Sequence, residues 1–124
     1  MSTPRVSIVM ATWNRAPMIS KTIESVWNQS FKDWELIVTD DGSKDNTEEV
    51  VGDWQKRILP DGRQARIVFI KSETNQGISK NYNKAFRLAK GEYIAMIDDD
   101  EPWCDDRKLE KQVKFLDENK SYAG

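Results

Sequence analysis

Four consecutive acidic residues, Asp98 to Glu101, end an apolar stretch of the chain. Neighbouring carboxylates repel one another, so such a cluster favours a bound cation. The sequence has no histidine and one cysteine, Cys104, which leaves oxygen atoms as the available metal ligands. Oxygen ligands suit a hard divalent ion, Mg²⁺ or Mn²⁺, and such ions commonly share their coordination shell between one or two carboxylates, water and phosphate oxygens. The cluster therefore predicts a metal ion that binds a diphosphate.

Composition and charge narrow the possible classes of function. The 124 residues fit one domain, and a net charge of −2 argues against a nucleic-acid binder, which needs a basic surface. The absence of histidine excludes Ser-His and Cys-His nucleophilic schemes. No apolar run approaches the roughly 20 residues that span a bilayer, and a single cysteine suits a reducing compartment. We expect a cytoplasmic protein, free or peripheral to the inner face of a membrane, with no transmembrane segment.

Apolar periodicity predicts four strand–helix units. The predicted strands are residues 5–12, 34–39, 65–71 and 93–97, and the predicted helices are 17–29, a segment opened by Asp45 and Glu48 in capping-box spacing, 78–90, and a last helix from near Asp105. Strands that alternate with helices pair in parallel through right-handed crossovers. The expected fold class is therefore α/β, an open, mainly parallel sheet with helices on both faces.

Polar residues follow each of the four predicted strands. The segments are 12–15, 40–43, 72–77 and 98–101, and the second and fourth are acidic. Ligands of open parallel sheets bind beyond the carboxyl ends of the strands, so these segments are expected to meet at one edge. Aspartate also favours turns and helix caps, which leaves a purely structural role open for the segment DDGS. The triple aspartate exceeds what one cap requires.

Other phosphate-binding folds are not supported. Neither G-x-G-x-x-G nor G-x-x-x-x-G-K-[ST] follows the first strand, so the sequence lacks the dinucleotide and Walker-type loops. Receiver domains place their acidic clusters after the first and third strands, whereas here the clusters follow the second and fourth.

Two stretches of the chain together resemble glycosyltransferase family 2. They are VSIVMATWNRAPMISKTIESVWNQSFKDWELIVTDDGSKDNTEEVV (6–51) and NQGISKNYNKAFRLAKGEYIAMIDDDEPW (75–103). The resemblance implies the Rossmann-like, nucleotide-sugar-binding half of a GT-A fold. It also implies inverting, Mn²⁺- or Mg²⁺-dependent transfer of a sugar from a nucleotide-diphospho-sugar to an acceptor hydroxyl.

The resemblance assigns the nucleotide-binding residues. Thr12 and Trp13 match a pair whose backbone meets the nucleobase and whose aromatic ring stacks on it; a core aromatic is the alternative for Trp13. Asp41 matches the aspartate that accepts the N3–H of uracil, whereas cytosine would leave that carboxylate unpaired. A UDP-sugar is therefore the expected donor. Asn14 is included in the predicted nucleotide-binding set.

Asp98, Asp99 and Asp100 match the D-x-D segment of the family. Counted back from Trp103, Asp100 falls at the metal-ligating position. Asp98 and Asp99 lie nearer the ribose and diphosphate, and Asp98 is also assigned to the metal. Tyr82 stands where the family commonly has arginine, which leaves one donor contact open.

The chain is short for the family. The resemblance implies that residues 1–124 form one N-terminal donor-binding domain, with the acceptor-binding half and the catalytic base expected beyond Gly124. The base, the sugar and the acceptor (carbohydrate, lipid-linked or protein) are unassigned. One alternative is a non-catalytic interaction module that keeps the fold and self-associates through an unpaired sheet edge. A nucleotidyltransferase is less consistent, because ATWNRAP is not a glycine- and arginine-rich loop.

Overall fold

The computed structural model describes residues 3–73 and 76–119, apart from the side chains of 78 and 79. Its elements are β1 (Val6–Thr12), α1 (Ala16–Trp27), β2 (Trp34–Asp40), α2 (Thr47–Gln55), β3 (Arg66–Lys71), α3 (Ile78–Leu88), β4 (Tyr93–Met96) and α4 (Lys108–Glu118). The four strands form one parallel sheet in the order β3-β2-β1-β4. The predicted α/β class is confirmed, and each predicted element is present with ends shifted by a few residues.

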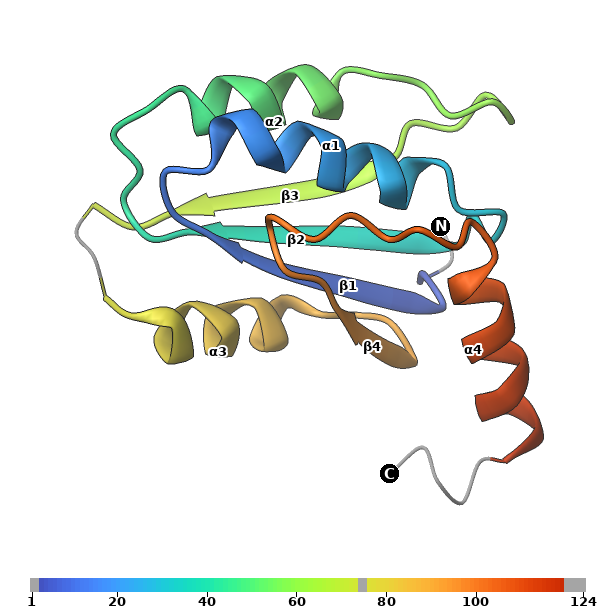
Figure 1. Ribbon diagram of the computed structural model, residues 1–124. Helices are drawn as coiled ribbons and strands as arrows, with labels where there is room; N and C mark the ends of the chain where they lie inside the picture. The colour runs from blue at the N-terminus through green and yellow to red at the C-terminus, as the bar shows by residue number, and fades with distance from the viewer. Residues whose placement is uncertain (1–2, 74–75, 120–124) are drawn as a thin grey trace.

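Helices cover both faces of the sheet. Helices α1 and α2 lie on one face and α3 lies on the other, while α4 stands beside β4 (Figure 1). Successive strand residues point to opposite faces, so β1 sends Ile8 to the α1–α2 side and Val9 to the α3 side. Ile37 of β2 and Ala85 of α3 pack with Val9. Burial of both faces explains why the central strands are almost continuously apolar.

The start of α2 differs from the capping-box prediction. The helix begins at Thr47, and Asn46 precedes it without a side-chain hydrogen bond to the helix. Asp45 accepts the Thr47 N–H through Oδ1 at 3.1 Å. Its Oδ2 accepts the N–H of Ala16, the first residue of α1, also at 3.1 Å. The Asp45 carboxylate is thus shared between the starts of two helices, which the local spacing could not show.

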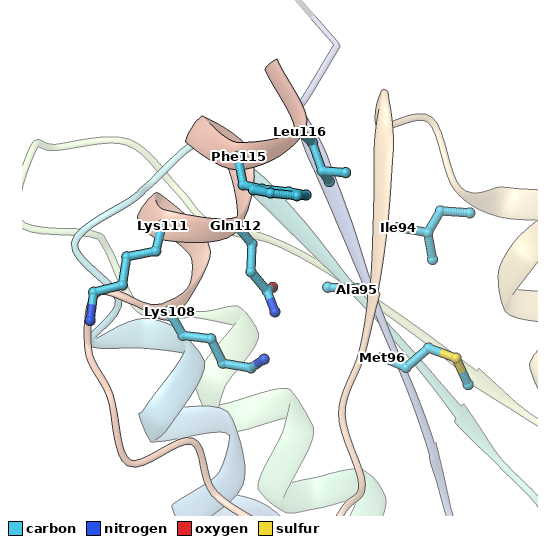
Figure 2. A pocket seen from close by; sticks show the side chains of 8 residues that line it. All are labelled: Ile94, Ala95, Met96, Lys108, Lys111, Gln112, Phe115 and Leu116. Atoms are coloured by element: carbon cyan, nitrogen blue, oxygen red, sulfur yellow. The ribbon is translucent and has the colours of Figure 1, made fainter. Parts of the chain in front are cut away.

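An apolar hollow of about 600 Å³ lies between β4 and α4 (Figure 2). It is lined by Ile94, Ala95, Met96, Lys108, Lys111, Gln112, Phe115 and Leu116. Ala95 points toward α4, whereas Ile94 and Met96 point away from it. Within residues 3–73 and 76–119 no strand pairs with the outer edge of β4, so this side of the sheet exposes both backbone and apolar side chains.

A buried carboxylate joins β1, β2 and β3 at the opposite end from their carboxyl ends. Glu35 is fully buried and accepts hydrogen bonds from Ser7 Oγ (2.6 Å), Arg66 Nε (2.8 Å) and the Lys90 N–H (2.7 Å). Burial alone would raise the pKa of Glu35, but the hydrogen bonds from Ser7, Lys90 and Arg66 outweigh it and leave the pKa lowered. The same cluster holds the α3–β4 connection, since the Gly91 N–H donates to Ser7 Oγ at 2.7 Å.

Replacing this carboxylate by an amide should destabilise the fold. We expect Glu35→Gln to lower the free energy of unfolding by about 1–3 kcal/mol at neutral pH, because an amide nitrogen would then face buried donors. A lowered pKa means that the ionised group stabilises the fold above its ordinary titration range and that this contribution is lost as the pH falls through the folded-state pKa. Urea unfolding should therefore show the difference between variant and wild type narrowing in acid.

The exposed Glu49→Gln on α2 makes the same chemical change outside the cluster and should match wild type. A Glu35→Gln difference that stayed constant from neutral to acid pH would contradict the role of the ionised carboxylate.

Candidate functional site

A hollow of about 210 Å³ opens beyond the carboxyl ends of β1, β2 and β4. It is lined by Ala11, Thr12, Trp13, Arg15, Asp41, Asn81 and Asp99. The polar segments that follow the first, second and fourth strands therefore supply side chains to one place, as the parallel topology predicts. Of the predicted site residues, Thr12, Trp13, Asp41 and Asp99 line this hollow, whereas Asn14, Asp98 and Asp100 lie outside its lining.

Asn14 shapes the loop that carries this end of β1. Its backbone is in the left-handed region (φ 53°), which asparagine tolerates better than most residues. Its N–H donates to Ser43 Oγ at 2.7 Å, and its Oδ1 accepts the Lys44 N–H at 2.7 Å. These bonds join the β1–α1 loop to the β2–α2 loop. The structure thus gives Asn14 a loop-shaping role, and its contact with a nucleotide stays a prediction.

The two aspartates at the end of β2, Asp40 and Asp41, have separate roles. Asp40 is fully buried, and its Oδ1 accepts from both the N–H (2.9 Å) and the hydroxyl (2.6 Å) of Ser43. Asp41 is 6% exposed and lines the hollow. It accepts the Gln76 N–H through Oδ1 and the Gly77 N–H through Oδ2, the latter at 3.1 Å. Asp40 therefore builds the turn, and Asp41 is the carboxylate available to a ligand.

Ionised Asp41 is favoured by its surroundings. Burial by itself would raise the pKa of this carboxyl. Hydrogen bonds from the Gln76 N–H, the Asn81 side chain and the Gly77 N–H, with the nearby charge of Lys84, outweigh burial and leave the pKa lowered. The site therefore presents a fixed anionic hydrogen-bond acceptor.

Thr12 and Trp13 lie at the rim formed by β1. Thr12 is buried, and its hydroxyl donates to Asp99 Oδ2 at 2.8 Å. Trp13 is 51% exposed while lining the hollow, so the alternative of a core aromatic is wrong. An indole face that is partly exposed beside a polar hollow can stack on a planar ligand.

Asp99 is the member of the acidic segment that enters the hollow. Its backbone oxygen accepts the Thr22 hydroxyl of α1 at 2.8 Å, which ties the segment to the helix. Burial raises the pKa of Asp99, and the Asp100 charge acts in the same direction. The Thr12 hydroxyl and the Arg15 charge oppose the rise without cancelling it.

The acidic segment fits a metal that is only partly held by protein. Among the residues that the structure describes, no three Asp, Glu, His or Cys side chains gather as a metal-binding set. Asp98 is exposed and lines a separate hollow with Glu101 and Trp103, and Asp100 is half-buried, so both carboxylates remain accessible to an ion. Two carboxylates completed by water and diphosphate oxygens form a donor set that Mg²⁺-type ions accept.

Sequence reasoning assigned no role to Asn81 or Arg15, yet both line the hollow. Asn81 is 1% exposed and lies one helical turn before the buried Ala85. A polar residue on the inward face of a helix is the signal that could have identified it.

Tyr82 is half-buried beside Phe86, with a ring-centroid distance of 6.1 Å. Its pKa is raised, first by burial and then by the charges of the acidic segment.

Comparison with known proteins identifies the family. The model of glycosyl transferase family 2 matches residues 7–124. The chain belongs to glycosyltransferase family 2. It is 38% identical over 122 residues to the uncharacterized glycosyltransferase MJ1057 of Methanocaldococcus jannaschii, a match that covers 97% of this chain and 40% of that protein. The chain therefore spans about two fifths of the length of this relative.

Solved structures share the fold. The crystal structure of S. aureus TarS 1-349 in complex with UDP-GlcNAc has a TM-score of 0.81 at 26% identity and covers 92% of this chain and 31% of that chain. The mannosyltransferase PcManGT from Pyrobaculum calidifontis, in complex with GDP-Man and Mn²⁺, has a TM-score of 0.80 at 28% identity, over 93% and 33%. These matches confirm the GT-A type of α/β fold.

Within the described part of the chain, no helix combines the length and apolar character needed to cross a bilayer.

The carboxylate shared by two helix starts gives a prediction for this glycosyltransferase domain. Asp45→Ala removes the acceptor of the Ala16 and Thr47 N–H groups, so we expect a loss of about 1 kcal/mol in the free energy of unfolding. Urea unfolding measures it, and Asp53→Ala, on the exposed face of α2, serves as the matched control. Equal stability of the two variants would show that Asp45 does not support the loops.

Proposed function

We propose that this domain binds the nucleoside diphosphate of a nucleotide-sugar, with a UDP-sugar as the expected donor and Mn²⁺ or Mg²⁺ as the cofactor. The proposed reaction is inverting transfer of the sugar to an acceptor hydroxyl. The observation that carries the proposal is one hollow beyond the strand ends that combines an exposed indole, a fixed anionic acceptor and a half-buried carboxylate. The UDP-GlcNAc bound by TarS and the GDP-Man and Mn²⁺ bound by PcManGT support this class of ligand.

The nucleobase is proposed to lie against Trp13, with its pairing edge directed at Asp41. Stacking on an aromatic ring contributes roughly 1–3 kcal/mol per base and does not depend on which base is bound. The hydrogen bond to Asp41 does depend on it, because an ionised carboxylate accepts and cannot donate. Uracil offers an N3–H, whereas cytosine presents a lone pair at that atom, which would face the carboxylate with no hydrogen between the two acceptors.

The diphosphate is proposed to lie toward the acidic segment, where Asp100 and Asp98 would hold the divalent ion. A bound divalent cation supplies positive charge to the nucleoside diphosphate leaving group. Asp99, held by the Thr12 hydroxyl, is proposed to face the ribose and diphosphate. Arg15 lines the same hollow and adds the one cationic side chain of that lining, which suits a phosphate oxygen.

The acceptor side of the reaction needs a general base to take the proton of the attacking hydroxyl. No residue of this chain is proposed for that role. Transfer is proposed for a protein that also contains an acceptor-binding part, and the domain described here supplies donor binding. The sugar and the acceptor are therefore outside the proposal.

Calorimetric titration with UDP tests the donor site. We expect binding in Mn²⁺ that weakens by at least about tenfold when the metal is chelated. Asp100→Ala should abolish the metal-dependent part while leaving thermal unfolding unchanged, because this half-buried side chain is not part of the core.

Glu101→Ala, a neighbouring exposed carboxylate, should behave as wild type in the same titration. Binding that is absent, or equal with and without metal, would contradict the proposal. An unfolded Asp100→Ala variant would show that the carboxylate serves the fold instead.

Self-association is the second proposal, and it rests on the outer edge of β4. Ile94 and Met96 are about half exposed beside the hollow of Figure 2, and an unpaired edge strand with apolar neighbours favours pairing with another copy. Light scattering should show a mass that rises with protein concentration and falls for Met96→Lys. Ile58→Lys, at an equally exposed site away from β4, is the control. A monomer at every concentration would refute this proposal.

A further inference from the structure

Asn81, in the first turns of α3, lies beside the proposed base-reading carboxylate, because Asn81 and Asp41 line the same hollow. Its Nδ2 donates to the Gly77 backbone oxygen at 3.2 Å, and the Gly77 N–H in turn donates to Asp41 Oδ2 at 3.1 Å. The Gly77 acceptor fixes which end of the amide is the nitrogen, because an oxygen in that position would face another oxygen. The N–H donors of Asn81 are therefore held at the glycine that binds Asp41, and the Asn81 side chain is among the causes that lower the pKa of Asp41.

Packing does not explain an asparagine at this position. Asn81 is 1% exposed, and within the described residues its Oδ1 is buried without a hydrogen-bond partner. Such an orphaned acceptor costs about 1–3 kcal/mol. A leucine of similar size would avoid that cost, as the apolar Ala85 does one turn later on the same face. The hydrogen bonds donated by the amide nitrogen must therefore offset the free-energy cost of the unpaired amide oxygen.

The donors around Asp41 restrict its carboxylate. Rotation about the last side-chain bond of aspartate is broad, so the orientation of the group depends on its partners. Two backbone donors come from the loop that precedes α3, at Gln76 and Gly77, and the Asn81 side chain, which holds the Gly77 oxygen, adds to the stabilisation of the Asp41 charge. Of these three, only Asn81 acts through a side chain that can be exchanged without altering the loop.

We propose that Asn81 is a positioning residue that orients the Asp41 carboxylate and thereby sets the selection of bases that carry an N–H at their pairing edge. This inference rests on the proposed function. It adds that selectivity between uracil and cytosine nucleotides depends on a residue that does not itself contact the base. The family resemblance assigns no role to this position.

Asn81→Leu separates positioning from stability. The change removes the donor and also removes the orphaned acceptor, so the unfolding midpoint should equal or exceed that of wild type. Titration with UDP and CDP in Mn²⁺ should show wild type preferring UDP by about tenfold or more, and the variant losing most of that preference. Asn83→Ala, an exposed asparagine on the same helix, should keep the wild-type ratio.

A second measurement does not depend on nucleotide binding. The ¹³C carboxyl resonance of Asp41, followed against pH without ligand, should titrate at a higher pH in Asn81→Leu than in wild type, because a donor to the ionised form is lost. An unchanged UDP-to-CDP ratio overturns the inference. Where wild type binds neither nucleotide, the proposed function fails, and an unmoved Asp41 titration then overturns the positioning role separately.

Discussion

Parallel pairing of β1 with both of its neighbours is the constraint on which the site depends. The register sets Thr12 opposite Asp40, and the Asp41 N–H continues the ladder by donating to the Thr12 oxygen at 3.0 Å. On the other side Ile97 donates to Val9, so the chain after β4 runs out beside the end of β1. Residues separated by tens of positions in the sequence thus meet at one edge with little freedom to move. A one-residue slip of β1 would move each of its side chains to the opposite face of the sheet, and the different packing of the two buried faces opposes it.

Several carboxylates crowd this edge, and the structure compensates them unequally. Asp40 Oδ1 accepts from the N–H and the hydroxyl of Ser43, while its Oδ2 is buried without a hydrogen-bond partner among the described residues; Asp41 accepts two backbone N–H groups. Asp99 has one hydroxyl partner and a raised pKa. Asp98 is exposed and Asp100 is half-buried. Compensation by protein donors is therefore strongest at Asp41, and the proposed cation would add compensation at the acidic segment.

Apolar periodicity in the sequence predicted the features that depend on neighbouring residues, namely the helices and strands. Apolar runs of the right length identified all four strands. Their alternation with helices was enough to predict that the strands pair in parallel and that the candidate site lies at the edge formed by their carboxyl ends. What the local patterns could not show depends on tertiary partners. Asp45 fits a capping box by spacing but serves two helix starts, and Asn14, whose nucleotide contact stays a prediction, also holds one loop to another. Asn81 was missed because its partner, Asp41, lies 40 positions away, and nothing in the helix pattern reveals that contact.

Two buried polar side chains at opposite ends of the sheet show how stability and function divide in this domain. Glu35 lies at the opposite end of the sheet from the hollow. Both of its carboxylate oxygens accept hydrogen bonds, and it joins three strands, so its burial strengthens the fold. Asn81, beside the hollow, satisfies its nitrogen and leaves its oxygen orphaned. A fully satisfied polar group can be selected for stability alone, whereas a half-satisfied one lowers stability and persists only where its remaining contact has a use. The proposed orientation of Asp41 is that use, and it would place the energetic cost of base selection at Asn81, on the helix behind the hollow.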